Sequence, residues 1–85
     1  MEPQQYFEEK FKDFYKENQK KHIPEIEIQK DLAKHCSKFI NSRNLYKLIE
    51  MWTLQNCVFL NRTFATYKVP DTEESIHIVH YFLYE

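Results

Sequence analysis

The sequence contains no glycine, and this absence excludes several kinds of site. Phosphate-cradling loops, dinucleotide-binding turns and the nucleophile turn of many hydrolases all use glycine, because the backbone there takes a positive φ or approaches a ligand closely. Two-residue hairpin turns of the Asn-Gly type are excluded as well, so a hairpin in this chain needs a longer connection. We therefore expect no nucleotide-binding loop and no hydrolase of that type.

Cysteines are few, and long apolar runs are absent. Only Cys36 and Cys57 occur, and the chain opens without an apolar secretory segment, so a reducing nuclear or cytoplasmic setting is expected. In that setting the sequon Asn61-Arg62-Thr63 is expected to stay unmodified. No run approaches the roughly 18 apolar residues that a membrane span requires. These features predict a soluble, intracellular protein without membrane association.

The four histidines and two cysteines lack the spacing of a metal site. His35 and Cys36 are adjacent, and no C-x-x-C or H-x-x-x-H pair occurs. His77 and His80 are expected on opposite faces of a strand. Cys36 is expected to be buried and unreactive, and no carboxylate pair stands out as general acid and base. We expect a protein that is not an enzyme and has no metal, cofactor or small-molecule substrate.

What the sequence does contain is typical of one small globular domain spanning residues 1–85. Hydrophobic residues make up 42% and charged residues 29%, which is far from the composition of a disordered chain. Aromatic residues are abundant at 16%, with seven Phe, six Tyr and one Trp. Large rings bury enough area to stabilise a small core without disulfides.

Three segments have the 3.6-residue periodicity of amphipathic helices. They are residues 3–19, residues 29–39, and a segment that follows the N-cap residues Asn41 and Ser42 and ends near residue 56. Their apolar positions are, in order, Phe7, Phe11 and Phe14; Ile28, Leu32, Cys36 and Phe39; and Leu45, Leu48, Ile49 and Trp52. Residues 25–28 form a short alternation that fits either a brief strand or the lead-in to the second helix.

The last third of the chain changes to a period of two. Residues 58–69 alternate as a strand does, residues 76–84 are expected to form a second strand, and the polar residues 70–75 between them predict a turn. The predicted fold class is therefore α+β, with a three-helix core and a C-terminal two-stranded antiparallel hairpin.

This order of helix, short strand, two helices and hairpin resembles that of a winged-helix domain, whose helix-turn-helix core is closed by a two-stranded wing. The resemblance implies either DNA binding or protein docking in replication, telomere, transcription or trafficking complexes. In a DNA-binding member the third helix reads the groove, which here implies a role for Arg43, Asn44, Lys47, Met51 and Gln55. The same helix carries Glu50 and only two basic residues, and this departure favours docking.

Charge is concentrated in the middle of the chain. Residues 30–68 carry a net +5, residues 1–29 carry −2 and residues 69–85 carry −4. A basic surface of this kind suits phosphate contacts, although a solvated helix face has the same composition. The candidate nucleic-acid-binding residues include a lysine stripe at every fourth position of the second helix, and they are Lys30, Lys34, Lys38, Arg43, Asn44, Lys47 and Arg62.

Six tyrosines remain after the phenylalanines and Trp52 are assigned to the core. Tyrosine is favoured at interfaces, because its ring buries area while its hydroxyl stays hydrogen bonded. Both faces of the final strand are apolar, so one face is expected to be covered either by the first helix or by a partner. The candidate partner-binding residues are Tyr67, Tyr81 and Tyr84.

The leading functional hypothesis is a module that docks a protein subunit within a nucleic-acid-associated assembly. Direct binding of DNA or RNA through the second and third helices and the hairpin is one alternative. A small inhibitor of viral type, which caps a host factor through its aromatic face, is the other.

Overall fold

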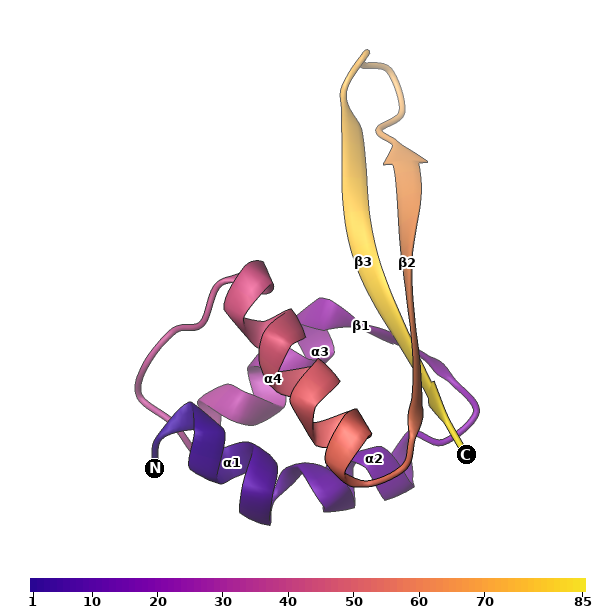
Figure 1. Cartoon of the computed structure of the whole chain (residues 1–85). Helices are drawn as coiled ribbons and strands as arrows, with labels where there is room; N and C mark the ends of the chain where they lie inside the picture. The colour runs from indigo at the N-terminus through magenta and orange to yellow at the C-terminus, as the bar shows by residue number, and fades with distance from the viewer.

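A computed structural model describes the whole chain, residues 1–85, and its fold is α+β as predicted. Four helices and three strands follow one another along the chain, with the helices at one end and to one side of the sheet (Figure 1). In chain order the elements are α1 Pro3–Glu9, α2 Phe11–Glu17, β1 His22–Pro24, α3 Glu25–Ala33, α4 Ser42–Gln55, β2 Phe59–Lys68 and β3 Ser75–Tyr84.

The first predicted helix is divided at Lys10, whose φ of −115° interrupts the helical backbone. No proline or glycine lies at the break. Its effect is to turn both halves toward the core, where Tyr6, Phe7, Phe11 and Tyr15 are all buried. The prediction of an amphipathic segment is therefore confirmed, but the count of three helices is wrong.

The second predicted helix begins earlier and ends earlier than expected. The alternation at residues 25–28 is the first turn of α3, where Glu25 and Glu27 suit the positive end of the helix dipole. The helix stops at Ala33, and the backbone N–H of Cys36 turns back to the carbonyl of Leu32 at 2.9 Å. Cys36 is buried as predicted, but it lies in the connection to α4 and not on a helix.

Helix α4 confirms the prediction made from its caps and periodicity. The Asn41 side chain accepts a 2.9 Å hydrogen bond from the backbone N–H of Asn44, as an N-cap residue does. The helix then buries Leu45, Ile49 and Trp52 on one face and ends at Gln55, one residue before the expected end.

The predicted hairpin is present, but the sheet contains a third strand. β2 pairs with β3 over their full length, and the short strand β1 pairs with β3 on its other side, with His22 opposite Phe82. The connection after Lys68 uses Asp71 at a φ of 63°, a conformation that glycine would otherwise supply. The distal half of the hairpin extends beyond the helices (Figure 1).

One cluster of 15 buried residues joins the helices to the sheet. Trp52 packs α4 against α2 in this cluster, with its ring centroid 4.8 Å from that of Phe11 and 5.3 Å from that of Tyr15. Leu83 and Tyr81 of β3 complete the cluster from the sheet side. The helices and the inner half of the hairpin thus share one core. None of the four helices combines the length and the apolar character that crossing a membrane demands.

Candidate docking surface on helix α4

The outward face of α4 carries apolar side chains as well as charges. Leu54 is 81% exposed, and Met51, one turn earlier, is about half exposed. Two apolar side chains on the solvent side of one helix are not needed for the core, which α4 contacts through Leu45, Ile49 and Trp52. Exposed apolar positions that gather on one element mark a surface for binding another molecule.

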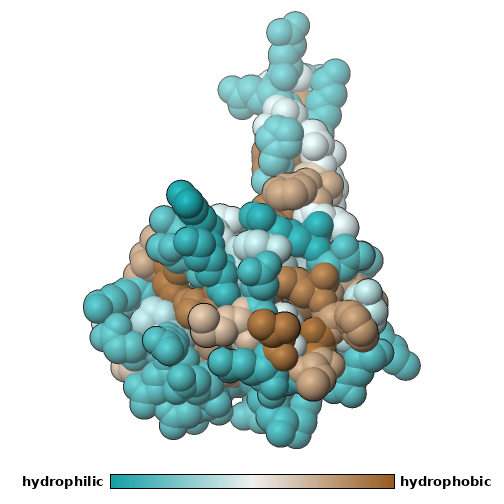
Figure 2. Space-filling model, viewed as in Figure 1, coloured by the Kyte–Doolittle hydropathy of each residue, from teal (hydrophilic) through white to brown (hydrophobic).

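A groove of about 390 Å³ lies between α4 and the start of β2. Most of its lining is apolar, and the residues are Tyr46, Glu50, Thr53, Leu54, Val58, Phe59 and Leu60. Figure 2 shows hydrophobic residues gathered on the viewed face where α4 approaches the lower part of β2, in contrast to the hydrophilic hairpin tip. We call this groove, together with Met51, the α4 docking surface.

Arg62 lies at the upper end of the groove, between α4 and β2. Its guanidinium carbon is 4.5 Å from the ring centre of Tyr46 and 5.0 Å from that of Phe64. One terminal nitrogen is 3.5 Å from the Ser42 hydroxyl, while Nε is buried without a hydrogen-bond partner. The side chain is thus held between two aromatic rings, which is a cation–π arrangement and not a free phosphate contact.

A hydrogen-bonded group fixes the base of α4 against α3 and the sheet. Glu25 Oε1 accepts a 2.8 Å hydrogen bond from the Ser42 hydroxyl and a 2.9 Å hydrogen bond from the Tyr81 hydroxyl. Burial and the bond to Glu25 raise the pKa of Tyr81 well above its usual value. The group links α3, the first turn of α4 and β3, and so it fixes the start of α4 relative to the sheet.

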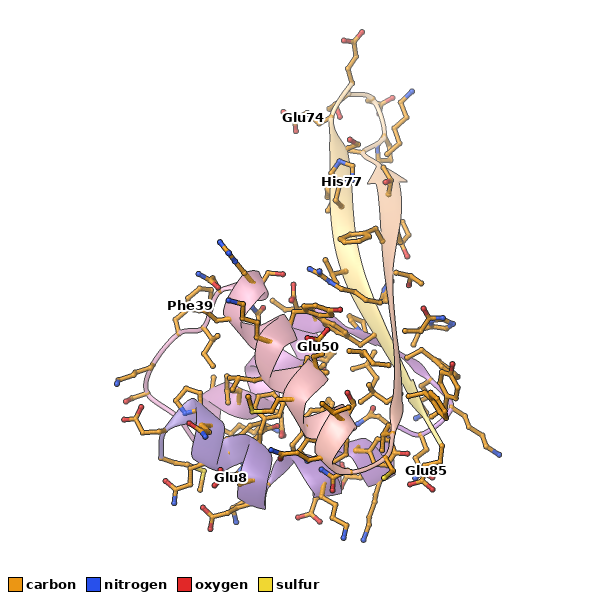
Figure 3. All side chains as sticks on the ribbon, viewed as in Figure 1. Glu8, Phe39, Glu50, Glu74, His77 and Glu85 are labelled. Atoms are coloured by element: carbon orange, nitrogen blue, oxygen red, sulfur yellow. The ribbon has the colours of Figure 1, made fainter.

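Glu50 supplies a negative charge on the wall of the groove. Hydrogen bonding to this carboxylate and partial burial raise the pKa of Tyr46, whereas Arg62 acts in the opposite direction. Figure 3 labels Glu50 on α4, on the side that faces the hairpin. An apolar groove with one carboxylate on its wall suits an apolar segment of a partner that also carries a basic group.

The predicted lysine stripe does not exist, because α3 ends at Ala33. Lys30 is on the helix and lies 3.8 Å from a Glu27 carboxylate oxygen, and Lys34 is the C-cap residue. Lys38 lies in the following connection, where its ammonium is 3.2 Å from Glu2 at the start of the chain. The three lysines therefore do not form a row on one helix face.

The other predicted nucleic-acid-binding residues are divided between two settings. Arg43, Asn44 and Lys47 are exposed on the first half of α4. Arg62 is half-buried and engaged with Tyr46, as described above. Only the three residues on α4 come together on one surface.

The three predicted partner-binding tyrosines also differ in their positions. Tyr67 and Tyr84 are exposed, whereas Tyr81 is fully buried with its hydroxyl on Glu25. A direct partner contact by Tyr81 is therefore ruled out in this fold. Tyr6 and Tyr15, which the sequence did not assign to the core, are core residues. Their hydroxyls have partners inside the fold, because Tyr6 donates a hydrogen bond to Asp31 and Tyr15 is hydrogen bonded to Glu85.

The residues that sequence reasoning missed are the apolar lining of the groove. Leu54 does not belong to the set of apolar residues that repeat with the helical period on the buried side of α4. An apolar residue outside that set is the signal that would have identified it. Phe59 and Leu60 looked like ordinary strand residues, and nothing in their spacing indicated that α4 leaves them partly uncovered. No three His, Cys, Asp or Glu side chains are grouped closely enough to hold a metal ion.

Comparisons of the chain with protein-family models, with curated proteins and with solved structures found no match.

Proposed function

We propose that this chain is a non-enzymatic, winged-helix-like interaction module that docks a protein subunit of a nucleic-acid-associated assembly. The observation that carries the proposal is the exposure of Leu54 in the lining of an apolar groove, with half-exposed Met51 one turn earlier on the same helix. A partner segment that covers these side chains removes apolar area from water, which is the main source of affinity at the centre of protein interfaces.

The winged-helix likeness is supported by the order and pairing of the elements. A short strand precedes the last two helices, and the hairpin follows them and pairs with that strand. In this scheme α3 and α4 are the helix-turn-helix pair, β2 and β3 are the wing, and α4 is the helix that contacts the ligand. The divided first helix is the main departure from a three-helix core.

Protein docking is favoured over reading of a DNA groove by the chemistry of the same helix. A groove-reading helix presents hydrogen-bonding and cationic side chains to bases and phosphates. The second half of α4 instead presents Met51 and Leu54 with Glu50 beside them, and a carboxylate is repelled by phosphate. These residues suit an apolar partner segment.

Nucleic-acid binding is the second candidate, and one observation favours it. Arg43, Asn44 and Lys47 are all exposed in the first two turns of α4, and the hairpin projects beside that end of the helix (Figure 1). Two cations and an amide on one surface are sufficient for weak phosphate contacts. In this candidate function the apolar half of the helix has no role.

The experiment that separates the two is a pull-down from the native source with the tagged chain, with and without nuclease. Three chains are compared: the unmodified chain, Leu54→Glu, and the double variant Arg43→Gln/Lys47→Gln. We expect a specific protein to be retained after nuclease treatment, lost with Leu54→Glu, and kept with the double variant. Leu54 is exposed, so its replacement should leave the fold intact, which circular dichroism checks.

The opposite pattern would support the second candidate. In that pattern, capture disappears after nuclease treatment and in the variant Arg43→Gln/Lys47→Gln, whereas Leu54→Glu behaves like the unmodified chain. Helix α4 would then be a nucleic-acid-binding helix.

A further inference from the structure

The sheet has a second surface, on the side away from the helices, which shares only Phe59 with the α4 docking surface. Side chains of β2 and β3 alternate between two faces, and the register places Tyr81 and Leu83 on the face that packs on the helices. The opposite face carries Phe59, Tyr67, Ile76 and Tyr84, which are 62%, 52%, 52% and 41% exposed. We call this the outer face, and these exposed fractions show that no helix covers it.

Aromatic rings cross the outer face at its base. The ring centroids of Phe59 and Tyr84 are 5.3 Å apart and stacked, and Phe82 lies 5.5 Å from Tyr84. His22 of β1 continues the row, 5.0 Å from Phe82. Tyr67 and Ile76, which pair with each other, form a second apolar group near the tip of the hairpin. The face is therefore apolar at both ends.

The charges at the two ends of the outer face have opposite signs. At the tip, the turn carries Asp71, Glu73 and Glu74 against Lys68. At the base, Lys20 and Lys21 immediately precede β1, and Lys20 lines the same pocket as Tyr84. Glu85 also lies at the base, but it is hydrogen bonded to Tyr15 of α2. Figure 3 labels Glu74 and Glu85 at the two ends of the hairpin.

We propose that the outer face binds the outer face of a second copy of this chain, with the two hairpins packed face to face and running in opposite directions. In this two-fold arrangement Tyr67 and Ile76 of each copy pack on the aromatic row of the other. The acidic tip of each copy then lies over Lys20 and Lys21 of its partner. A two-fold interface has to be self-complementary in this way. The acidic hairpin tip of one copy, placed opposite the two lysines at the other end of the second copy's sheet, meets that requirement.

The available area agrees with a dimer. Because an aromatic side chain buries about 150–250 Å² when it is covered, the four exposed large apolar side chains of the outer face alone offer on the order of 400 Å² per copy. The remaining side chains of this face, including Phe82, His80 and Ile78, add to that figure. A standard interface buries about 800 Å² per partner, and two sheets pack face to face at about 10 Å separation. A nucleic-acid strand is disfavoured here, because the acidic tip repels phosphate.

The first test is sedimentation velocity of the whole chain over a range of concentrations. We expect dimers to form between about 1 and about 100 µM, which is the range of moderate affinities. Tyr67→Lys should weaken the dimer at least about tenfold, because it places a charge in both halves of the interface. Thr66→Lys is the matched control, because Thr66 is exposed on the opposite face of the same strand, and it should dimerise as the unmodified chain does.

The second test uses charge reversal to check the direction of packing. One variant carries Lys20→Glu and Lys21→Glu, and the other carries Glu73→Lys and Glu74→Lys. Each alone should be monomeric, because tip and base then have the same sign. Mixed together, the two variants should form a dimer of one copy of each, because both contacts are again between opposite charges.

Three results would overturn the proposal. They are a chain that stays monomeric throughout the concentration range, a Tyr67→Lys variant that dimerises as strongly as Thr66→Lys, and charge-reversed variants that do not associate when mixed.

Discussion

The Tyr81 hydroxyl donates a 2.9 Å hydrogen bond to Glu25 Oε1, and this bond joins the final strand to the first turn of α3. The same oxygen accepts from Ser42 at the start of α4, so one carboxylate ties together the sheet and both helices beside it. The core tyrosine is therefore linked, through Glu25, to the start of the helix that forms one wall of the docking groove.

Removal of the Tyr81 hydroxyl should destabilise the fold. Tyr81→Phe keeps the ring in the core but deprives a half-buried carboxylate of a donor, and we expect the free energy of unfolding to fall by about 1–3 kcal/mol. Urea unfolding at neutral pH measures this change in the free energy of unfolding. Tyr84→Phe is the control, because the Tyr84 hydroxyl makes no hydrogen bond, and it should change stability by less than about 0.5 kcal/mol. Equal effects of the two substitutions would contradict the role assigned to Glu25.

Trp52 should be the largest single contributor to the core. Its ring packs against Phe11 and Tyr15, so Trp52→Ala should leave a cavity and cost about 3–5 kcal/mol of unfolding free energy. Thermal and urea unfolding both report this loss. A cost under about 1 kcal/mol would mean that the ring does not hold α2 against α4.

Stability should decline at alkaline pH. Burial and the bond to Asp31 raise the pKa of Tyr6, and burial and the bond to Glu25 raise that of Tyr81. Above about pH 10 the unfolded chain releases these protons and the folded chain keeps them. The contribution of these tyrosines to the free energy of unfolding is therefore fully present below about pH 10. It falls as the pH rises further, by up to about 1.4 kcal/mol per pH unit for each tyrosine.

Urea unfolding from about pH 9 to about pH 11.5 tests this expectation, because it spans the ionisation of ordinary tyrosines. Tyr6→Phe should be less stable at neutral pH and should show a shallower decline with pH than the unmodified chain. A decline that is just as steep in Tyr6→Phe would show that this hydroxyl does not hold its proton in the folded state.

Simultaneous replacement of Lys30, Lys34 and Lys38 by Gln should have little effect. The carboxylate pairs of Lys30 and Lys38 are exposed at the surface, and such pairs contribute between about 0 and 1 kcal/mol. We expect the unfolding free energy to change by less than about 1 kcal/mol and capture of the protein partner to persist. If this variant no longer captured the protein partner, the three lysines would have to be part of the binding surface.

The sequence predicts best the elements whose signals are local. Helix α4 is predicted because Asn41 caps it and its apolar positions repeat every three to four residues. The hairpin is predicted because its two strands are rich in β-branched and aromatic residues and a polar turn separates them. Both signals lie within the segment itself. The same is true of the opposite placement of His77 and His80.

The features that were missed depend on residues far apart in the chain. Tyr6 and Tyr81 are buried because Asp31 and Glu25, which lie on α3, accept their hydroxyls. Strand β1 exists because β3 is there to pair with His22–Pro24, three residues that alone have no strand signal. The break at Lys10 and the early end of α3 are likewise set by packing, which overrides helix propensity.

The most direct measurement of the central claim is the affinity of the captured partner for two variants, each measured across a range of salt concentrations. Docking on α4 predicts that Leu54→Glu weakens binding at least about tenfold and that Arg43→Gln/Lys47→Gln changes it less than about threefold. Two results together would contradict docking on α4. Leu54→Glu would bind as the unmodified chain does, and the double variant would bind weakly. The slope of log K against log salt would then be shallower for the double variant by about 0.9 for each lost phosphate contact.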